Sequence, residues 1–167
     1  DKDPNPFNSA YDDQFDGFYA WVQQTGGWSE DDKEWGEGYL RWFYSTMTNM
    51  TYAGKIAVGG AWPGFDDSLA HWGSDRKISR RCGETWQDTW SLADEYDVPI
   101  VLIATWNDFE EGTDIEYGIV KPATSDDGPT VLGYATTLTA TLSDCEDVTY
   151  TWDFGDGING SGAVVSH

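Results

Sequence analysis

Hydrophobic and polar residues follow two different patterns along the chain, and the change falls near residue 120. Before that point, apolar runs predict strands over 15–22, 55–60 and 99–105, and helical spacing predicts helices over 37–52 and 84–96. This alternation of strands and helices is typical of a parallel sheet built from β-α units.

The predicted elements of this first region each have a defined apolar side. In both helices, apolar residues recur at helical spacing and should face the core. They are Tyr39, Phe43, Met47 and Met50 in the first helix, and Trp86, Trp90 and Ala93 in the second. The third strand reads Pro-Ile-Val-Leu-Ile-Ala over 99–104 and has no polar position, so we expect it to be buried on both faces.

The region beyond residue 120 differs from the first in composition and in its hydrophobic pattern. Residues 121–129 are rich in Pro, Gly, Ser and Asp, which predicts a linker. After it, two-residue alternation predicts antiparallel strands over 131–142 and 148–154, and a further one over 162–166. We therefore expect residues 130–167 to form part of a small β-sandwich.

Both regions are short for the domains that their patterns indicate. A (β/α)8 barrel takes about 250 residues and a sandwich about 100, whereas the whole chain has 167. The predicted fold class is α/β: a partial (β/α)8 TIM barrel over 1–120, followed by a truncated Ig-like β-sandwich. We expect a segment of a larger protein, inactive alone, that lacks the N-terminal half of the barrel and the last sandwich strands.

Composition narrows the choice of partners. The chain has 10 Trp, 9 Tyr and 7 Phe, more than a core of this size needs, which favours stacking on sugar rings, although core packing is equally expected for any single Trp. A formal net charge of −21 repels phosphate backbones and argues against nucleic acid. No apolar stretch approaches the roughly 18 residues of a membrane span. The Cys and His spacings contain no CxxC or HExxH pattern, so neither a metal nor another cofactor is expected.

The segment after the third strand carries the candidate chemistry. It reads Trp-Asn-Asp-Phe-Glu-Glu-Gly-Thr over 106–113, and carboxylates at the end of a parallel strand lie where α/β enzymes place catalytic groups. Asp108 and Glu111 suit hydrolysis of a glycosidic bond, with Glu111 as general acid and Asp108 as an ionised base or stabiliser. The plainer interpretation is a solvated acidic loop. Whether the configuration is retained or inverted depends on the separation of the two carboxyl groups.

Three segments of residues 15–119 resemble the C-terminal half of a (β/α)8 glycoside hydrolase of families 71 and 99. They are Asp-Gly-Phe-Tyr-Ala-Trp over 16–21, Trp-Pro-Gly-Phe-Asp-Asp over 62–67, and the loop over 106–113. The resemblance implies that Asp108 and Glu111 are the catalytic pair of an endo-acting enzyme on α-linked polysaccharide. Family 71 has Gly, and family 99 has His, where Glu110 stands, so α-glucan and α-mannan both stay open.

The same segments supply the expected substrate-binding residues. They are Asp16, Tyr19, Trp21, Trp62, Asp66, Trp106, Asn107 and Glu110. Each tryptophan has two possible roles: a platform on which a sugar ring stacks, or packing at the barrel mouth. Asp16 could accept a hydrogen bond from a sugar hydroxyl group or could form a turn. Asp66 could line the rim of the pocket or cap the next segment. A basic cluster, Arg76, Arg80 and Arg81, is expected to balance nearby acids.

The tail carries a second resemblance. Residues 148–157 and 160–167 resemble a PKD (polycystic kidney disease) domain, an Ig-like spacer of extracellular enzymes and surface proteins. Asp153 and Asp156 in this segment are expected to form turns rather than a calcium site. The resemblance implies an extracellular or cell-surface location.

These observations predict a glycoside hydrolase fragment from a secreted protein, acting on polysaccharide by two-carboxylate catalysis without a cofactor. The alternative is a non-catalytic surface protein that binds glycans and uses PKD modules as spacers.

Overall fold

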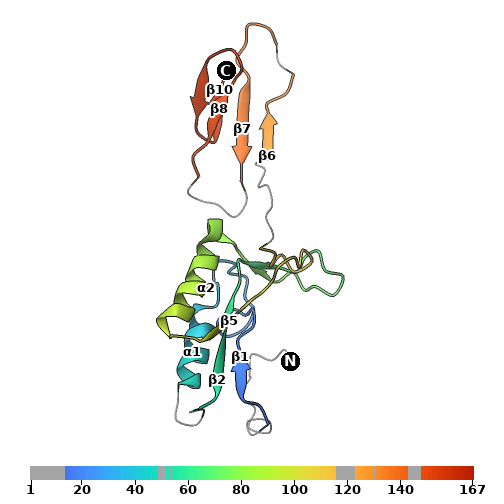
Figure 1. Ribbon diagram of the computed structural model, residues 1–167. Coiled ribbons are helices and arrows are strands. Elements are labelled where there is room, and N and C mark those ends of the chain that lie inside the picture. Colours follow the sequence, from blue (N-terminus) through green and yellow to red (C-terminus); the bar gives the residue numbers. More distant parts are fainter. Residues whose placement is uncertain (1–13, 49–51, 53, 116–122, 130, 143–147) are drawn as a thin grey trace. The chain divides into compact units, whose positions relative to one another are not determined.

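The computed structural model describes residues 14–48, 52, 54–115, 123–129, 131–142 and 148–167 (Figure 1). The chain divides into two compact units, Asp1–Glu116 and Tyr117–His167, and each is described by itself. Within the described residues, no helix has the length and apolar character needed to cross a membrane.

A parallel sheet forms the centre of the first unit. It contains β1 (Gly17–Tyr19), β2 (Ile56–Ala61) and β5 (Ile100–Ile103) in the order β1-β2-β5. Helix α1 (Glu37–Met47) connects β1 to β2, and α2 (Glu84–Glu95) lies between β2 and β5. Figure 1 shows both helices on the same face of the sheet. The predicted β-α order and the parallel direction of the strands are therefore confirmed.

Helix α1 covers the sheet with the apolar face that its spacing predicts. Tyr39, Phe43 and Met47 are buried, and Met50 lies outside the described residues. Gly59 of β2 permits the close approach, because a Cβ there would stand 2.8 Å from the Tyr44 hydroxyl oxygen. The first turn of α1 begins at Gly36, whose backbone N–H donates to a Glu34 carboxylate oxygen at 3.0 Å.

Helix α2 differs from the prediction in the residues that it buries. Its buried face consists of Thr85, Thr89, Leu92 and Ala93, whereas Trp90 is exposed and Trp86 half-buried. The centroids of the two tryptophan rings are 5.7 Å apart, on the side of α2 that faces away from the core. Threonines replace larger residues on the inner face because they leave room for a buried tryptophan in the loop after β2. Their hydroxyl groups are satisfied by backbone carbonyls, such as that of Ser79, which accepts from Thr85 at 2.6 Å.

Strand β5 is not buried on both faces, which corrects the prediction from its apolar run. Ile100, Leu102 and Ile103 are all exposed. One edge of β5 pairs with β2, and no strand of the described residues pairs with the other edge. An apolar sequence fixes which residues can be buried, but burial also needs a neighbouring element to cover them.

A hairpin stands between β2 and α2 at the carboxyl end of the sheet. Its strands β3 (Phe65–Asp66) and β4 (Lys77–Ile78) are antiparallel. The 3-10 helix η2 (Arg81–Gly83) then leads directly into α2. This hairpin supplies residues beside the loop that follows β5.

The second unit consists of two small antiparallel sheets. One has the order β10-β7-β6, with β6 (Ala123–Asp126), β7 (Thr137–Thr141) and β10 (Val164–Ser166). The other pairs β8 (Thr151–Asp153) with β9 (Asn159–Ser161). Ala140 is the one fully buried apolar residue among those described here.

Two predictions for this unit need correction. Part of the expected linker over 121–129 forms strand β6, because its backbone pairs with β7 although its side chains are polar. The strand expected over 131–142 begins only at Thr137, since residues 131–136 form a turn around Gly133, whose φ is +89°. Asp153 and Asp156 form turns as expected, accepting backbone N–H groups of Gly155 and Ile158 at 2.9 Å each.

Candidate active site

The candidate site lies where the three parallel strands end. The segment after β5 begins at Ala104, whose N–H donates to the Ala61 carbonyl at 2.9 Å and extends the sheet by one bond. The chain then leaves the sheet and forms a loop over 105–115. The predicted catalytic residues Asp108 and Glu111 both lie on this loop.

Two threonines close the base of the loop. The hydroxyl groups of Thr105 and Thr113 are 2.8 Å apart, and the Thr105 N–H donates to the Thr113 carbonyl at 2.8 Å. The Ile115 N–H adds a bond to the Thr105 carbonyl at 3.1 Å. Thr113 is fully buried. The loop therefore has a fixed base from which Asp108 and Glu111 project.

Hydrogen bonds to the backbone hold the two carboxylates near each other. The Asp108 N–H donates to the Thr105 hydroxyl at 3.1 Å. The Asp108 side chain accepts the Glu111 N–H at 3.1 Å and so closes the turn between them. The structure thus brings the predicted pair together, and it gives Asp108 a structural role that the residue spacing alone did not reveal.

The environment of Glu111 favours its protonated form. Burial raises the pKa of the Glu111 carboxyl above its ordinary value, the negative charge of Asp108 raises it further, and Arg76 opposes both effects. A raised pKa extends the protonated form of a carboxyl group to higher pH, which is the direction that a general acid needs. Among the described residues, no three His, Cys, Asp or Glu side chains come together as a metal-binding group.

The loop after β2 contacts the loop over 105–115 directly. The Asp66 N–H donates to the Glu111 carbonyl at 2.7 Å. Gly112 has a φ of +58°, and a Cβ at this position would stand 3.2 Å from the backbone nitrogen of Asp66. Glycine at 112 therefore permits both the turn and the close contact. This contact places Asp66 beside Glu111 and Gly112.

An ion pair between Asp67 and Arg76 lies next to Asp66, the residue that contacts the loop over 105–115. Asp67 is fully buried, and one of its oxygens accepts Nε of Arg76 at 2.7 Å and contacts an Nη of Arg76 at 2.6 Å. Burial favours a higher pKa for Asp67, but the hydrogen bonds from Arg76 and Ser74 outweigh it and lower the pKa. The guanidinium carbon of Arg76 also lies over two aromatic rings, 5.0 Å from the centroid of Trp28 and 5.3 Å from that of Phe65. No pattern along the chain indicates this pairing, apart from the presence of a basic cluster.

The other two arginines of the cluster also pair with acids, as expected. Arg80 donates to the carboxylate of Asp114 at 2.9 Å and to the Gly112 carbonyl at 2.9 Å, which ties the loop over 105–115 to the residue before η2. Arg81 forms an ion pair with Asp88 of α2 at 2.5 Å. The predicted role of the cluster, to balance nearby acids, is confirmed.

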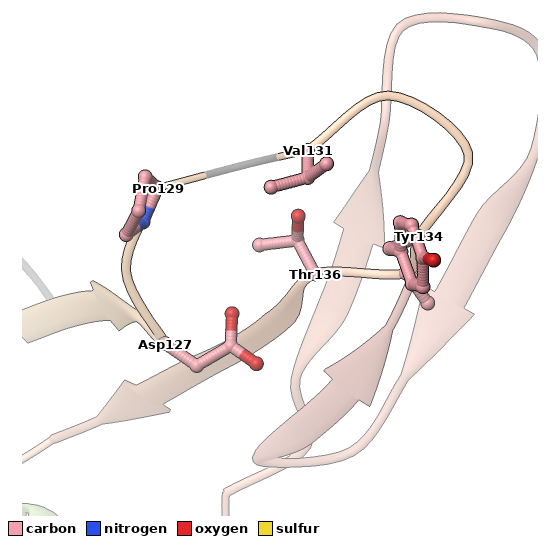
Figure 2. Close-up of a pocket in the computed structure, with 6 residues that line it drawn as sticks. Asp127, Pro129, Val131, Tyr134 and Thr136 are labelled. Atoms are coloured by element: carbon pink, nitrogen blue, oxygen red, sulfur yellow. The ribbon is translucent and has the colours of Figure 1, made fainter.

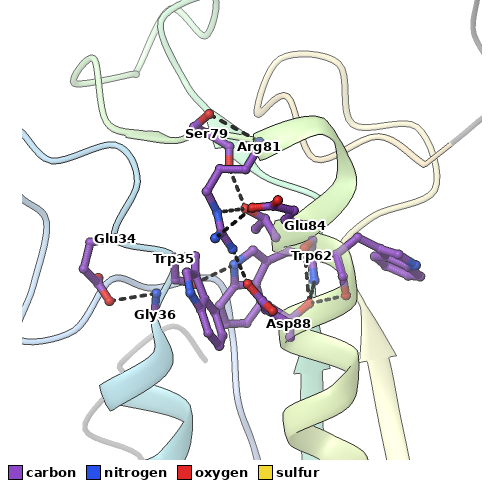
Figure 3. A network of polar contacts seen from close by, with 11 residues as sticks. Glu34, Trp35, Gly36, Trp62, Ser79, Arg81, Glu84 and Asp88 are labelled. Atoms are coloured by element: carbon purple, nitrogen blue, oxygen red, sulfur yellow. Dashed lines mark hydrogen bonds and ion pairs between the residues drawn. The ribbon is translucent and has the colours of Figure 1, made fainter. Parts of the chain in front are cut away.

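Trp62 does not have the position expected of a sugar platform. Its exposed fraction is 0%, and its indole nitrogen donates to the Trp35 carbonyl at 3.2 Å. Figure 3 shows this ring inside the network that joins Trp35, Arg81 and Asp88. Trp62 is buried because the chain turns inward after β2 and places the ring between the two helix N-termini, so it belongs to the core.

The remaining predicted residues fall into two groups. Tyr19, Trp21, Trp106, Asn107 and Glu110 are exposed at or just beyond strand ends on the carboxyl side. Tyr19 and Trp21 contact each other edge to face at 6.2 Å. Asp16 lies at the opposite end of the sheet, because it precedes β1 and its carbonyl accepts the N–H of Ile56, the first residue of β2. The structure therefore does not bring Asp16 to the candidate site.

Comparisons with known proteins bear on both resemblances: a family model supports the PKD resemblance of the tail, and solved structures support the glycoside hydrolase resemblance at the level of the fold alone. Residues 120–167 match the family model described as PKD domain. Two solved structures are similar to the chain: the GH99 endo-alpha-mannosidase from Bacteroides thetaiotaomicron and this enzyme in complex with BIS-TRIS-propane. Each has 23% sequence identity, a TM-score of 0.50 and a match over 64% of this chain.

The chain spans about 30% of the first of these structures and 31% of the second. No curated protein matches the chain. At this identity the two structures establish a shared fold in the matched region, which is mixed α/β, and nothing beyond the fold.

Proposed function

We propose that this chain is part of a secreted glycoside hydrolase that cleaves α-linked polysaccharide, either α-mannan or α-glucan, by two-carboxylate catalysis. The observation that carries the proposal is the pair formed by Asp108 and Glu111, which one turn holds together at the carboxyl edge of a parallel sheet. The raised pKa of Glu111 supports its assignment as the acid. The likeness to the fold of an endo-alpha-mannosidase favours this reaction class over others that use two carboxylates.

In the proposed reaction, Glu111 donates its proton to the glycosidic oxygen as the bond between that oxygen and the anomeric carbon breaks. The positive charge that develops on the sugar ring is stabilised by the Asp108 carboxylate, which then either activates a water molecule or attacks the anomeric carbon itself. Water finally supplies the hydroxyl group of the new reducing end. The choice between the two routes follows from the carboxyl separation in the complete site.

Exposed side chains beside the pair would bind the polysaccharide. We assign stacking on sugar rings to Tyr19, Trp21 and Trp106, whose rings are exposed at the carboxyl side of the sheet. Asn107 and Glu110 are exposed on the same loop as the acid and would bind hydroxyl groups, with Asp66 at the rim. Trp62 and Asp16 have no part in this assignment.

The remaining barrel strands would complete the site in the whole protein. The apolar side chains of β5 are exposed and its outer edge has no partner strand among the described residues, which is how a barrel strand looks without its neighbour. A neighbouring strand would cover Ile103 and wall the loop over 105–115. PKD domains are typical of extracellular proteins, and the match over 120–167 therefore supports secretion, with this unit as a spacer.

Turnover by the full-length protein tests the proposal. Glu111→Gln removes the proton donor while preserving size, and we expect hydrolysis of α-mannan or α-1,3-glucan to fall by about 10² to 10⁴-fold. Glu95→Gln is the matched control. It makes the same change on α2, where Glu95 forms an ion pair with Arg41 between two exposed side chains. Unchanged turnover in Glu111→Gln would refute the assignment, and binding without any turnover in the parent would favour the non-catalytic alternative.

A further inference from the structure

The turn that joins β6 to β7 in the second unit carries apolar side chains into solvent. Leu132 is 100% exposed and Tyr134 78% exposed, and Val131 is exposed beside them. Turns are normally occupied by polar residues and glycine, and neighbouring exposed apolar side chains indicate a binding surface. These three apolar side chains are exposed together although the chain as a whole is strongly acidic, with a net charge of −21.

Val131 and Tyr134 border a hollow of about 320 Å³ on the surface of the second unit (Figure 2). Its lining combines apolar and polar groups: Asp127, Pro129, Val131, Tyr134, Ala135 and Thr136. Figure 2 shows the Asp127 carboxylate directed into the space enclosed by the turn, with Thr136 facing it. Volumes of this order hold a small ligand such as one sugar ring.

Backbone hydrogen bonds fix the shape of the hollow on both sides. The Asp127 N–H donates to the Thr137 carbonyl at 3.1 Å, and the Tyr134 N–H donates to the Val131 carbonyl at 3.0 Å. The Asp127 carboxylate, in contrast, has no hydrogen bond or ion pair with any residue that the structure describes. The backbone of Asp127 is held by its bond to the Thr137 carbonyl, and its exposed carboxylate, without a partner among the described residues, is available to a ligand.

We propose that this hollow is a carbohydrate-binding subsite, in which the Tyr134 ring stacks on the apolar face of a sugar and the Asp127 carboxylate accepts hydrogen bonds from its hydroxyl groups. An exposed ring beside an uncompensated carboxylate suits a neutral ligand with many hydroxyl groups, and the negative charge of the chain disfavours anions. The choice of polysaccharide as ligand rests on the proposed function. The subsite would hold the polymer near the enzyme without taking part in hydrolysis.

Affinity electrophoresis of the full-length protein in native gels containing α-mannan or α-1,3-glucan tests this subsite. We expect Tyr134→Ala to weaken retention by about tenfold, because the stacking surface is lost. Asp127→Asn should weaken retention less, because an amide oxygen still accepts hydrogen bonds, and Tyr134→Phe should restore most of it. Ile158→Ala is the matched control, since Ile158 is an apolar residue of the same unit and is 56% exposed.

Hydrolysis of a short soluble oligosaccharide, measured in parallel, separates this inference from the proposed function. Unchanged turnover with lost polymer retention in Tyr134→Ala supports a separate subsite. Equal retention of parent and Tyr134→Ala overturns it, as does a change of sedimentation in Tyr134→Ala without any effect on sugar, which would indicate a protein contact. Retention that depends on Tyr134 in a protein without turnover would uphold the subsite and remove the proposed hydrolase.

Discussion

Replacing Arg76 with methionine should destabilise the first unit by about 3 kcal/mol, because the substitution leaves the Asp67 carboxylate buried without its countercharge. The carboxylate is fully buried and receives Nε of Arg76 at 2.7 Å, together with backbone N–H groups of Arg76 at 2.8 Å and Ser74 at 3.2 Å. Breaking a buried pair costs about 3–5 kcal/mol. The lower end applies, since the two backbone donors remain and the Arg76 side chain keeps 31% exposure.

The pH dependence of this loss has a definite sign. In the parent, the pKa of Asp67 is lowered in the folded state, so the pair contributes stability above the unfolded pKa of about 3.9 and loses it as pH falls through the folded value. Without the Arg76 side chain, two of the causes that lower the pKa of Asp67 are lost, so the pKa rises relative to the parent. The variant then binds a proton more readily when folded, and its deficit against the parent should narrow as pH falls from neutral toward about 4.

Urea unfolding of the full-length protein, followed by tryptophan fluorescence at neutral and mildly acidic pH, measures both effects in the transition of the first unit. Arg41→Met is the control, because Arg41 pairs with Glu37 and Glu95 at the surface and its loss should cost at most about 1 kcal/mol. The double variant Asp67→Asn with Arg76→Met should recover part of the loss. If Arg76→Met costs no more than Arg41→Met, or if its deficit is the same at both pH values, the reasoning is wrong.

Two further predictions concern the core and the acid. Trp62→Ala should lower the free energy of unfolding by about 3–5 kcal/mol because the ring is fully buried, and a loss of sugar binding without a loss of stability in the same unfolding assay would contradict this. Asp108→Asn should lower the pKa of Glu111 toward its ordinary value, since one of the two causes that raise it most is removed while burial remains. Carboxyl NMR titration of Glu111 in the full-length protein checks the shift, and a pKa that stays the same or rises would count against electrostatic coupling of the pair.

Local patterns along the chain were enough to predict the elements of the first unit and the place of its candidate catalytic residues. The spacing of Tyr39, Phe43 and Met47 predicted the buried face of α1, since a helical period depends only on neighbouring turns. The apolar run over 99–104 predicted β5, and its end placed Asp108 and Glu111 at the carboxyl edge of the sheet. Those features follow from residues that lie close together along the chain.

The surroundings of each residue, in contrast, depend on how the elements pack in three dimensions. Trp62 and Trp21 both follow strands, yet one is buried between helix N-termini and the other is exposed, because different elements lie above them. The pairing of Arg76 with Asp67 requires the hairpin of β3 and β4, and the raised pKa of Glu111 requires burial beside Asp108. Burial, countercharge and pKa depend on groups that folding brings within a few ångströms, and no pattern along the chain records those distances.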